Sequence, residues 1–314
     1  MTVLAVGIFV KIAAEMWKEL RMEKPTADDI VAAVKASGYL MEQEVATTIE
    51  SLGFHVETSR GYEDIDEGKS REIDVWGIQR VHQDETNQIS VFVELICECK
   101  NNQNPFVFLT RQKNEADRHL APEEYVFPSR DFPVPIENRP NAVSLIPAFR
   151  YLDLAKANYR FQTDHKAVQF AKIVRDKKDW SANHAGLYDS IFYTMVKALL
   201  SRRKEIPRQG DYRYVWLFFP LVVTNGEIFQ MDSWISPLIP RSVDYISMRR
   251  HLRSKRMDGE FNLDFVTQAG LTEFISKRIE PFIQAVVQRV KAAPEFFRPN
   301  PAIRSTARTI PTEP

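Results

Sequence analysis

Hydrophobic and polar positions follow two rhythms along the first hundred residues. Apolar residues recur every three to four positions after Thr26 and again over residues 40–52. This spacing predicts two helices, and Gly38 and Gly53 fit their ends. Alternation of apolar and polar positions with β-branched side chains then predicts three strands, at residues 54–57, 71–76 and 89–99.

The pattern changes after residue 104. Frequent prolines and poor periodicity from 105 to 147 predict a mostly irregular stretch, and helical spacing then resumes over 152–174 and over 187–199. A strongly apolar run at 214–223 predicts another strand, in which Pro220 argues for a bulge or a sheet edge.

The last third of the chain carries turn and helix signals. Asn225 and Gly226 form a favourable hairpin turn into residues 227–229, and a last strand is expected over 243–248. A helix is expected from about residue 267 to residue 290, bent at Pro281.

The resulting order is helix, three strands, helix and strand, which predicts an α/β fold with a mixed sheet flanked by helices. The expected division has five parts. These are an N-terminal helical segment at 1–37, an α/β core at 38–104 and 186–250, a partly helical insertion at 105–185, a C-terminal helical segment at 251–293 and a flexible tail at 294–314.

Composition places the chain among soluble globular proteins. It has 314 residues with 42 basic and 42 acidic side chains, so phosphate contacts would have to come from local patches. The apolar stretch from Leu4 to Val10 runs into charged residues and predicts an amphipathic helix, not a signal peptide. No membrane span is expected, and Cys97 and Cys99 are expected to be reduced in a cytoplasmic protein.

Four polar side chains are expected to converge. Glu98 and Lys100 lie two residues apart at the end of a strand and therefore share a face. A turn centred near residues 85–86 places Asp74 opposite position 97 or 98. Glu42 lies at the margin of the apolar stripe of its helix, which must face the sheet.

Clustered carboxylates repel one another unless a cation compensates. Mg²⁺ accepts two or three carboxylates together with water and a substrate phosphate, and Mn²⁺ would substitute. Lys100 would orient or deprotonate a bound water, or neutralise developing charge. This set of residues suits phosphodiester hydrolysis.

Asp74, followed by Glu98-Cys99-Lys100 at the end of an apolar strand, resembles the PD-(D/E)XK motif of the restriction-endonuclease-like superfamily. Glu42 is similar in position to the first-helix glutamate of some members. The resemblance covers residues 38–102 and implies that Asp74, Glu98 and the Cys99 backbone carbonyl bind Mg²⁺, with Glu42 as an outer ligand. It also implies that Lys100 assists the attacking water. Ile73 stands where many members have proline.

Other charged and glycine-containing positions lie outside this set. Glu72 is an extra ligand or, as we favour, a salt-bridge partner, and Glu94 is expected to be structural. Gly68-Lys69-Ser70 does not complete a phosphate-binding loop, and the scattered histidines argue against a zinc site. A basic run either grips a phosphate backbone or is a solvated face. Its candidate nucleic-acid contacts are Arg249, Arg250, Arg253, Lys255 and Arg256.

Three hypotheses follow for the function. The first is a Mg²⁺-dependent endonuclease acting on DNA, in keeping with a restriction-like defence system. The second is a catalytically inactive binding or scaffold protein with the same fold. The third is an effector nuclease that is active only with a partner. A homodimer or a regulatory protein is the expected protein partner, and DNA against RNA stays open.

Overall fold

The computed structural model describes residues 24–139, 142–207, 212–254 and 256–297, and the chain divides into two units, residues 1–40 and 41–314. In the first unit, helix α2 (Ala27–Ser37) begins after Thr26, as predicted. The Thr26 and Asp29 side chains each accept the other's backbone N–H, and Gly38 ends the helix with a left-handed φ of 91°. The predicted helix around residues 4–10 lies outside the described residues.

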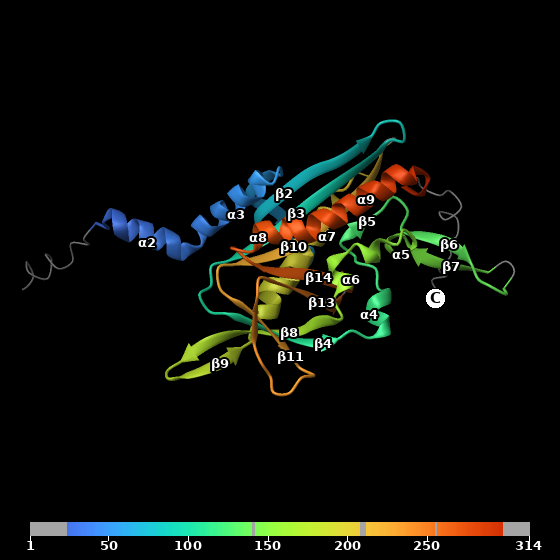
Figure 1. Ribbon diagram of the computed structural model, residues 1–314. Coiled ribbons are helices and arrows are strands. Elements are labelled where there is room, and N and C mark those ends of the chain that lie inside the picture. Colours follow the sequence, from blue (N-terminus) through green and yellow to red (C-terminus); the bar gives the residue numbers. More distant parts are fainter. Residues whose placement is uncertain (1–23, 140–141, 208–211, 255, 298–314) are drawn as a thin grey trace, which may run out of the picture. The chain divides into compact units, whose positions relative to one another are not determined.

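A mixed sheet is the framework of the second unit (Figure 1). Its strand order is β1-β2-β3-β10-β14-β13-β8-β4-β11-β12, with β5 paired to β10 and β9 paired to β8. The strands of this sheet are β1 (His55–Glu63), β2 (Ser70–Asp84), β3 (Ile89–Lys100), β4 (Phe106–Gln112), β5 (Tyr125–Val126), β8 (His165–Asp176), β9 (Asp179–Asn183), β10 (Arg213–Thr224), β11 (Ile228–Asp232), β12 (Arg241–Val243), β13 (Tyr245–Arg253) and β14 (Asp258–Thr267). A separate hairpin consists of β6 (Asp131–Pro135) and β7 (Val143–Pro147).

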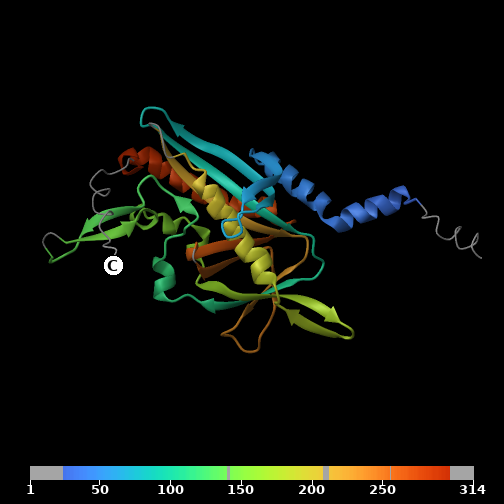
Figure 2. The same cartoon turned by 180° about the vertical axis from the view of Figure 1, so that it is seen from behind.

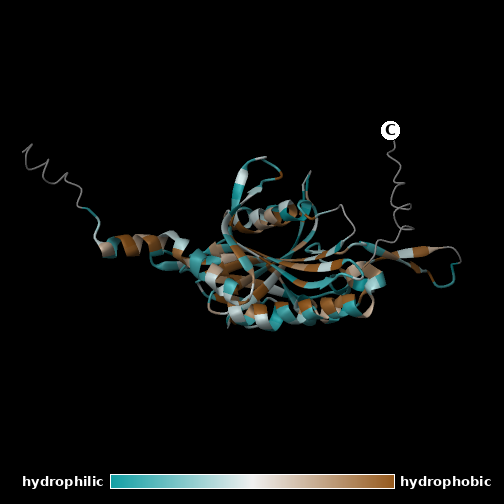
Figure 3. Cartoon of the chain, turned by 90° about the horizontal axis from the view of Figure 1, so that it is seen from above, coloured by the Kyte–Doolittle hydropathy of each residue, from teal (hydrophilic) through white to brown (hydrophobic). Residues whose placement is uncertain are grey.

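Helices cover both faces of this sheet, because each face of β3 and β10 is apolar. Residues of α3 and α9 pack on one face and those of α7 on the other, which Figures 2 and 3 show from behind and from above. The helices are α3 (Tyr39–Ser51), α4 (Glu115–His119), α5 (Ala148–Tyr151), η1 (Leu154–Lys156), α6 (Tyr159–Gln162), η2 (Tyr188–Tyr193), α7 (Thr194–Lys204), α8 (Leu271–Phe274), η3 (Ile275–Ile279), α9 (Glu280–Ala292) and η4 (Pro294–Phe297). Across the described residues, no helix is long and apolar enough to cross a membrane.

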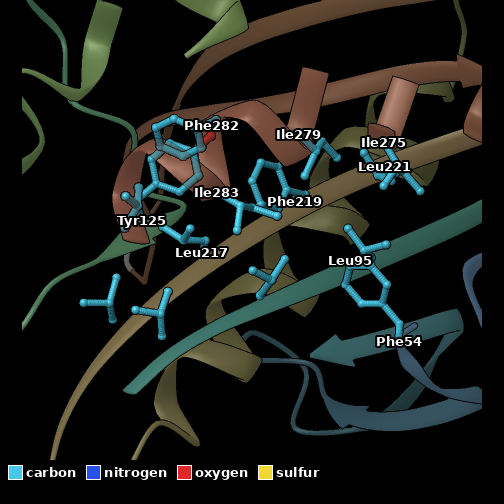
Figure 4. Packing of buried hydrophobic residues seen from close by; sticks show 14 of the residues in the cluster. Phe54, Leu95, Tyr125, Leu217, Phe219, Leu221, Ile275, Ile279, Phe282 and Ile283 are labelled. Carbon is cyan, nitrogen blue, oxygen red and sulfur yellow. The ribbon is translucent and has the colours of Figure 1, made fainter. Parts of the chain in front are cut away.

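The core between α9 and the sheet fixes the central strands. Figure 4 shows Phe282 and Ile283 of α9 directed toward Leu217 and Phe219 of β10, and all four side chains are buried. Burying a side chain of this size contributes about 1.5–3 kcal/mol. The middle of the sheet is therefore held firmly, and its strand ends are positioned by that rigid centre.

The predicted fold class is confirmed at the level of a mixed α/β sheet flanked by helices. Helix α3 precedes the antiparallel strands β1, β2 and β3, and β10 then follows α7 and pairs parallel to β3 along its whole length. The stripe of α3 is buried at Met41, Val45 and Ile49, as its spacing predicted.

The prediction of a mostly irregular stretch at 105–147 is wrong at strands β4 to β7, and the helical spacing expected over 152–174 is wrong at β8. Strands β4 and β8 pair with each other and join the main sheet, and β8 runs where helical spacing had been assigned up to residue 174. A short apolar run is compatible with both the helical and the strand period. Here the pairing of β8 with β4, more than fifty residues away, makes the segment a strand.

The predicted hairpin at Asn225-Gly226 is also wrong, because β11 pairs with β4 and β12 instead of β10. The Asn225 side chain accepts the backbone N–H of Asn102 at 2.7 Å. A Cβ at Gly226 would lie within 2.3 Å of the Asn102 carbonyl oxygen. These two residues therefore join the ends of β3 and β10 instead of reversing the chain.

Pro220 lies in the centre of the sheet and not at a bulge or an edge. Its strand β10 pairs with β3 on one side, and on the other side with β5 at residues 216–217 and with β14 from Leu221 onward. The Phe218 N–H donates to Glu124 on the β5 side, and position 220 faces the same side by alternation. Pro220 therefore falls where β5 has ended and β14 begins, so no ladder donor is lost.

The segment 251–293 is not helical throughout. Strand β14 occupies residues 258–267 beside β10, and the helical stretch begins at Leu271. A π-helical turn, η3, ends directly before α9, whose first turn holds Pro281. The tail is ordered at its start, because Phe297 in η4 is fully buried. Residues 298–314 lie outside the described residues.

Candidate active site

Asp74 lies where the ladder between β2 and β3 ends. The paired residues run from Asp84 and Ile89 to Val75 and Cys97, which places Asp74 beside Glu98, as the predicted turn position required. The next backbone donor of β3, the Cys99 N–H, donates to Asp74 Oδ2 at 2.7 Å. A side-chain oxygen therefore takes a hydrogen bond at the end of the ladder, and the carboxylate is held between the two strands.

Glu98 and Lys100 share a face of β3, as expected from their spacing. Lys100 Nζ donates to Glu98 Oε1 at 2.6 Å. The Glu98 side chain is 14% exposed and that of Lys100 is 28% exposed. Both groups are thus accessible to a ligand at the carboxyl end of a strand that is otherwise buried.

Glu42 reaches the same group from α3. Burial raises its pKa, and the nearby carboxylates of Glu98 and Glu72 raise it further. Glu44, two residues on, is exposed and accepts a hydrogen bond from Gln268. Glu72 is exposed and contributes to the local negative charge, and no salt bridge involving it is found among the described residues.

The electrostatics of Asp74 reflect this crowding. Burial raises the pKa of Asp74 to about 7, and the charges of Glu98 and Glu42 act in the same direction. The Cys99 N–H and Lys100 oppose the rise. Lys100 thus does not balance the three carboxylates, and the charged form of the group is disfavoured until another cation is supplied.

The donor set fits a hard divalent cation, because carboxylate oxygens and a backbone carbonyl are the ligands that Mg²⁺ prefers. Within the described ranges, no three His, Cys, Asp or Glu side chains stand close enough together to hold a metal ion by themselves. Asp74 and Glu98 would be joined by the Cys99 carbonyl, as the resemblance implied, with Glu42 further out.

The two cysteines do not contribute reactive thiolates. Burial raises the pKa of both thiols, and both are unbridged, as predicted. Neutral thiols at these positions leave only the backbone of Cys99 available to a cation.

Glu94, on the same face of β3, is structural, in agreement with the sequence. It is fully buried, accepts hydrogen bonds from Arg202 Nε at 2.9 Å and from Arg202 Nη2 at 3.1 Å, and accepts the Trp76 indole N–H at 2.7 Å. Arg202 therefore pairs with a strand carboxylate and is not part of an exposed basic helix end.

The basic run does not form one surface. Strand β13 carries its first half, so alternate residues point to opposite faces. Arg249 donates to Asp117 at 2.6 Å and is 11% exposed, and Arg250 lies over the Tyr188 ring at 5.1 Å. Both side chains are thus engaged within the protein. Arg253 and Arg256 are exposed, and Lys255 lies outside the described residues.

Sequence reasoning missed two groups beside the site. The fully buried Asp64 accepts hydrogen bonds from Lys197 at 2.9 Å and from Arg71 at 2.7 Å. Burial alone would raise its pKa, but these donors hold the pKa well below the usual range. Tyr62 is buried, which raises its pKa to about 12, and the charges of Asp74 and Glu98 contribute. Both residues fall between the strands expected at 54–57 and 71–76, so no periodicity placed them near the site.

Comparisons with known protein families, with curated proteins and with solved structures find no match to this chain.

Proposed function

We propose that this chain is a divalent-metal-dependent nuclease of the restriction-endonuclease-like fold that hydrolyses phosphodiester bonds in DNA. The observation that carries the proposal is the junction of Asp74, Glu98 and Lys100 at neighbouring strand ends, with Asp74 fixed by the Cys99 N–H. The succession of α3, three antiparallel strands, α7 and a strand parallel to β3 supports it, because a helix, three strands, a helix and a strand is the core order of the restriction-endonuclease-like fold.

Each residue of the site has a proposed role that follows from its position. Asp74, Glu98 and the Cys99 carbonyl would hold Mg²⁺ or Mn²⁺, with Glu42 as an outer ligand. The bound ion would neutralise charge on the phosphate and lower the pKa of a water molecule. Lys100 Nζ, which already contacts Glu98, would donate to the attacking water or to a phosphate oxygen and thereby orient the reactants.

The test compares cleavage by the wild type with cleavage by Asp74→Asn and Lys100→Met. Plasmid, single-stranded DNA and RNA are each incubated with Mg²⁺, Mn²⁺ or EDTA. Removing one group that stabilises developing charge lowers the rate by about a hundredfold or more. The exposed residues Asp176 and Lys178 provide matched controls, Asp176→Asn and Lys178→Met, which should retain wild-type rates.

The outcomes separate the hypotheses. Cleavage that persists in EDTA, or in both site variants, contradicts the assigned site. A wild type that binds Mn²⁺ by calorimetry but cuts none of the three substrates favours an effector that needs a partner. A wild type that neither binds Mn²⁺ nor cuts favours an inactive scaffold.

A further inference from the structure

A hollow of about 870 Å³ lies at the opposite end of the central strands from the candidate active site. It is bounded by the last turn of α7, the start of β10, the end of β5 and the turn between β13 and β14. Tyr214 at this end pairs with Ser90, whereas Lys100 pairs with Thr224 at the other end. Ten strand residues at about 3.3 Å each separate Tyr214 from Thr224 by roughly 30 Å along β10, and Ile65 reaches the hollow from the segment that follows β1.

Positive charge from three separate segments meets in this hollow. Arg203 and Lys204 come from α7, Arg213 from the start of β10, and Arg256 from the turn after β13. Arg203 also pairs with Glu123 at 3.1 Å. None of the described residues that line the hollow carries a carboxylate. Cationic side chains that are far apart in the sequence therefore line one surface.

Aromatic rings line the same hollow. Tyr212, Tyr214 and Phe127 are half-buried, and the two tyrosine rings stack at 6.5 Å with 22° between their planes. The row continues into the sheet, because Tyr214 packs near Phe92, which stacks on Trp216 at 4.6 Å. The rings are thus held in place by neighbours, and each half-buried ring keeps part of its surface accessible.

Cations next to held aromatic rings are the chemistry that recognises nucleotides. Lysine and arginine contact phosphates, and aromatic rings stack on bases with little dependence on sequence. Only unpaired bases offer a free face to a ring, because paired bases are stacked within a duplex. An acidic peptide would satisfy the charges but leave the rings unused. We infer that this hollow binds a segment of single-stranded nucleic acid, independently of whether the distant carboxylate site cleaves.

The binding test uses the full chain in EDTA, so that cleavage does not interfere. A short fluorescent oligothymidylate is titrated, and anisotropy reports binding. The double substitution Lys204→Glu/Arg256→Glu changes two exposed side chains and should weaken binding at least tenfold. The matched control, Lys178→Glu/Lys291→Glu, makes the same change in net charge at exposed positions elsewhere and should stay within about twofold.

Salt dependence and stacking provide two further readouts. Each phosphate contact on a single strand contributes about 0.7 to the slope of log affinity against log salt concentration, so the double variant should lose about 1.4 from that slope. Tyr212→Leu keeps apolar bulk but removes the ring, and it should weaken oligothymidylate binding about tenfold while leaving the salt slope unchanged.

The remaining arms identify the ligand and separate the two sites. Binding of a matched duplex as tight as that of the single strand would overturn the inference. Displacement of the oligonucleotide by an equal concentration of inorganic phosphate or thymidine monophosphate would also overturn the inference, because a free phosphate or nucleotide would then be the ligand. Oligonucleotide binding that is lost in Lys100→Met but kept in Lys204→Glu/Arg256→Glu would assign binding to the carboxylate site and overturn the inference without touching the proposed nuclease. Retained cleavage in the double variant together with lost binding supports both.

Discussion

Two glutamates on one face of β3, four residues apart, have opposite surroundings. Glu94 is fully buried and meets the Arg202 guanidinium and an indole N–H. Glu98 is partly exposed and lies beside Asp74. Among the described residues, Lys100 is the one cation that forms an ion pair with it. The negative charge of Glu94, in the middle of β3, is balanced by a cation. The negative charge of Glu98, at the end of β3, is not fully balanced.

The position of a glutamate along the strand therefore decides whether it serves to stabilise the fold or is available to a ligand. A charge in the middle of the sheet has no access to water and must be paired within the protein. A charge at the strand end can be partly solvated, so its environment can tolerate unbalanced carboxylates that a ligand later compensates. Four substitutions or additions test this contrast, and they are given in order of expected effect.

Breaking the buried pair should have the largest effect. Arg202→Ala leaves Glu94 charged and buried, which should lower the free energy of unfolding by about 3–5 kcal/mol, measured by urea denaturation. Arg203→Ala, at the next position, removes a half-buried arginine and should change stability by no more than about 1 kcal/mol. Similar losses in both variants would contradict the special status of the Glu94 pair.

Removing charge at the strand end should stabilise the protein. The pKa of Asp74 is about 7 in the folded state and near 3.8 in the unfolded chain, so the folded state holds the extra proton between these values. Stability contributed by this group is therefore highest below about pH 4 and is lost as pH rises toward 7. In EDTA at pH 8, Asp74→Asn should be more stable than the wild type by about 1–2 kcal/mol, because the site is partly exposed.

The test of that prediction is the pH profile. Asparagine keeps an oxygen that accepts the Cys99 N–H, so the two proteins should differ little at pH 4 in urea denaturation. Parallel stability curves from pH 4 to pH 8 would show that Asp74 does not titrate in this range.

A divalent cation should reverse the imbalance. At ten times its dissociation constant, Mg²⁺ bound only to the folded state adds about 1.4 kcal/mol, which corresponds to a rise in Tm of roughly 2 °C for a chain of this length. Differential scanning calorimetry should detect this rise in the wild type and in the exposed control Glu50→Gln. A rise of the same size in Asp74→Asn would contradict metal binding by this group.

The smallest effect is expected for Lys100. The ion pair with Glu98 is partly exposed, so Lys100→Met should change the free energy of unfolding by less than about 1 kcal/mol. Its loss should matter for cleavage and not for folding. A loss of 3 kcal/mol or more in urea denaturation would make Lys100 equivalent to Arg202 and remove the contrast between the two glutamates.

The sequence predicted the elements whose patterns are local. The helix over 39–51, the strands around Asp74 and Glu98 and the apolar strand β10 all have a continuous period and clear ends. The position of Asp74 beside Glu98 followed from one turn near residues 85–86. The predicted part of the site is thus the part in which each residue is placed by neighbours close in the sequence.

Long-range pairing decided the rest. Strand β14 shows alternation at Phe261, Leu263 and Phe265, but residues 251–293 were predicted to be a helical segment. Asp264 is instead buried, where Arg160 and Tyr159 donate to it across more than a hundred residues of sequence. The convergence of Arg203 with Arg256 is of the same kind, because neither residue carries information about the other.

The hydrogen bond from Cys99 to Asp74 turns one backbone amide into an indicator of the site. Its acceptor is a titratable side chain and not a fixed carbonyl, so the amide resonance of Cys99 in an NMR spectrum should move when Asp74 gains a proton or binds an ion. The amides of Ile96 and Cys97, inside the ladder and the core, should not move with it. The nitrogen-15 signal of Cys99 would then report both the ionisation of Asp74 and the binding of an ion, without any substitution in the chain.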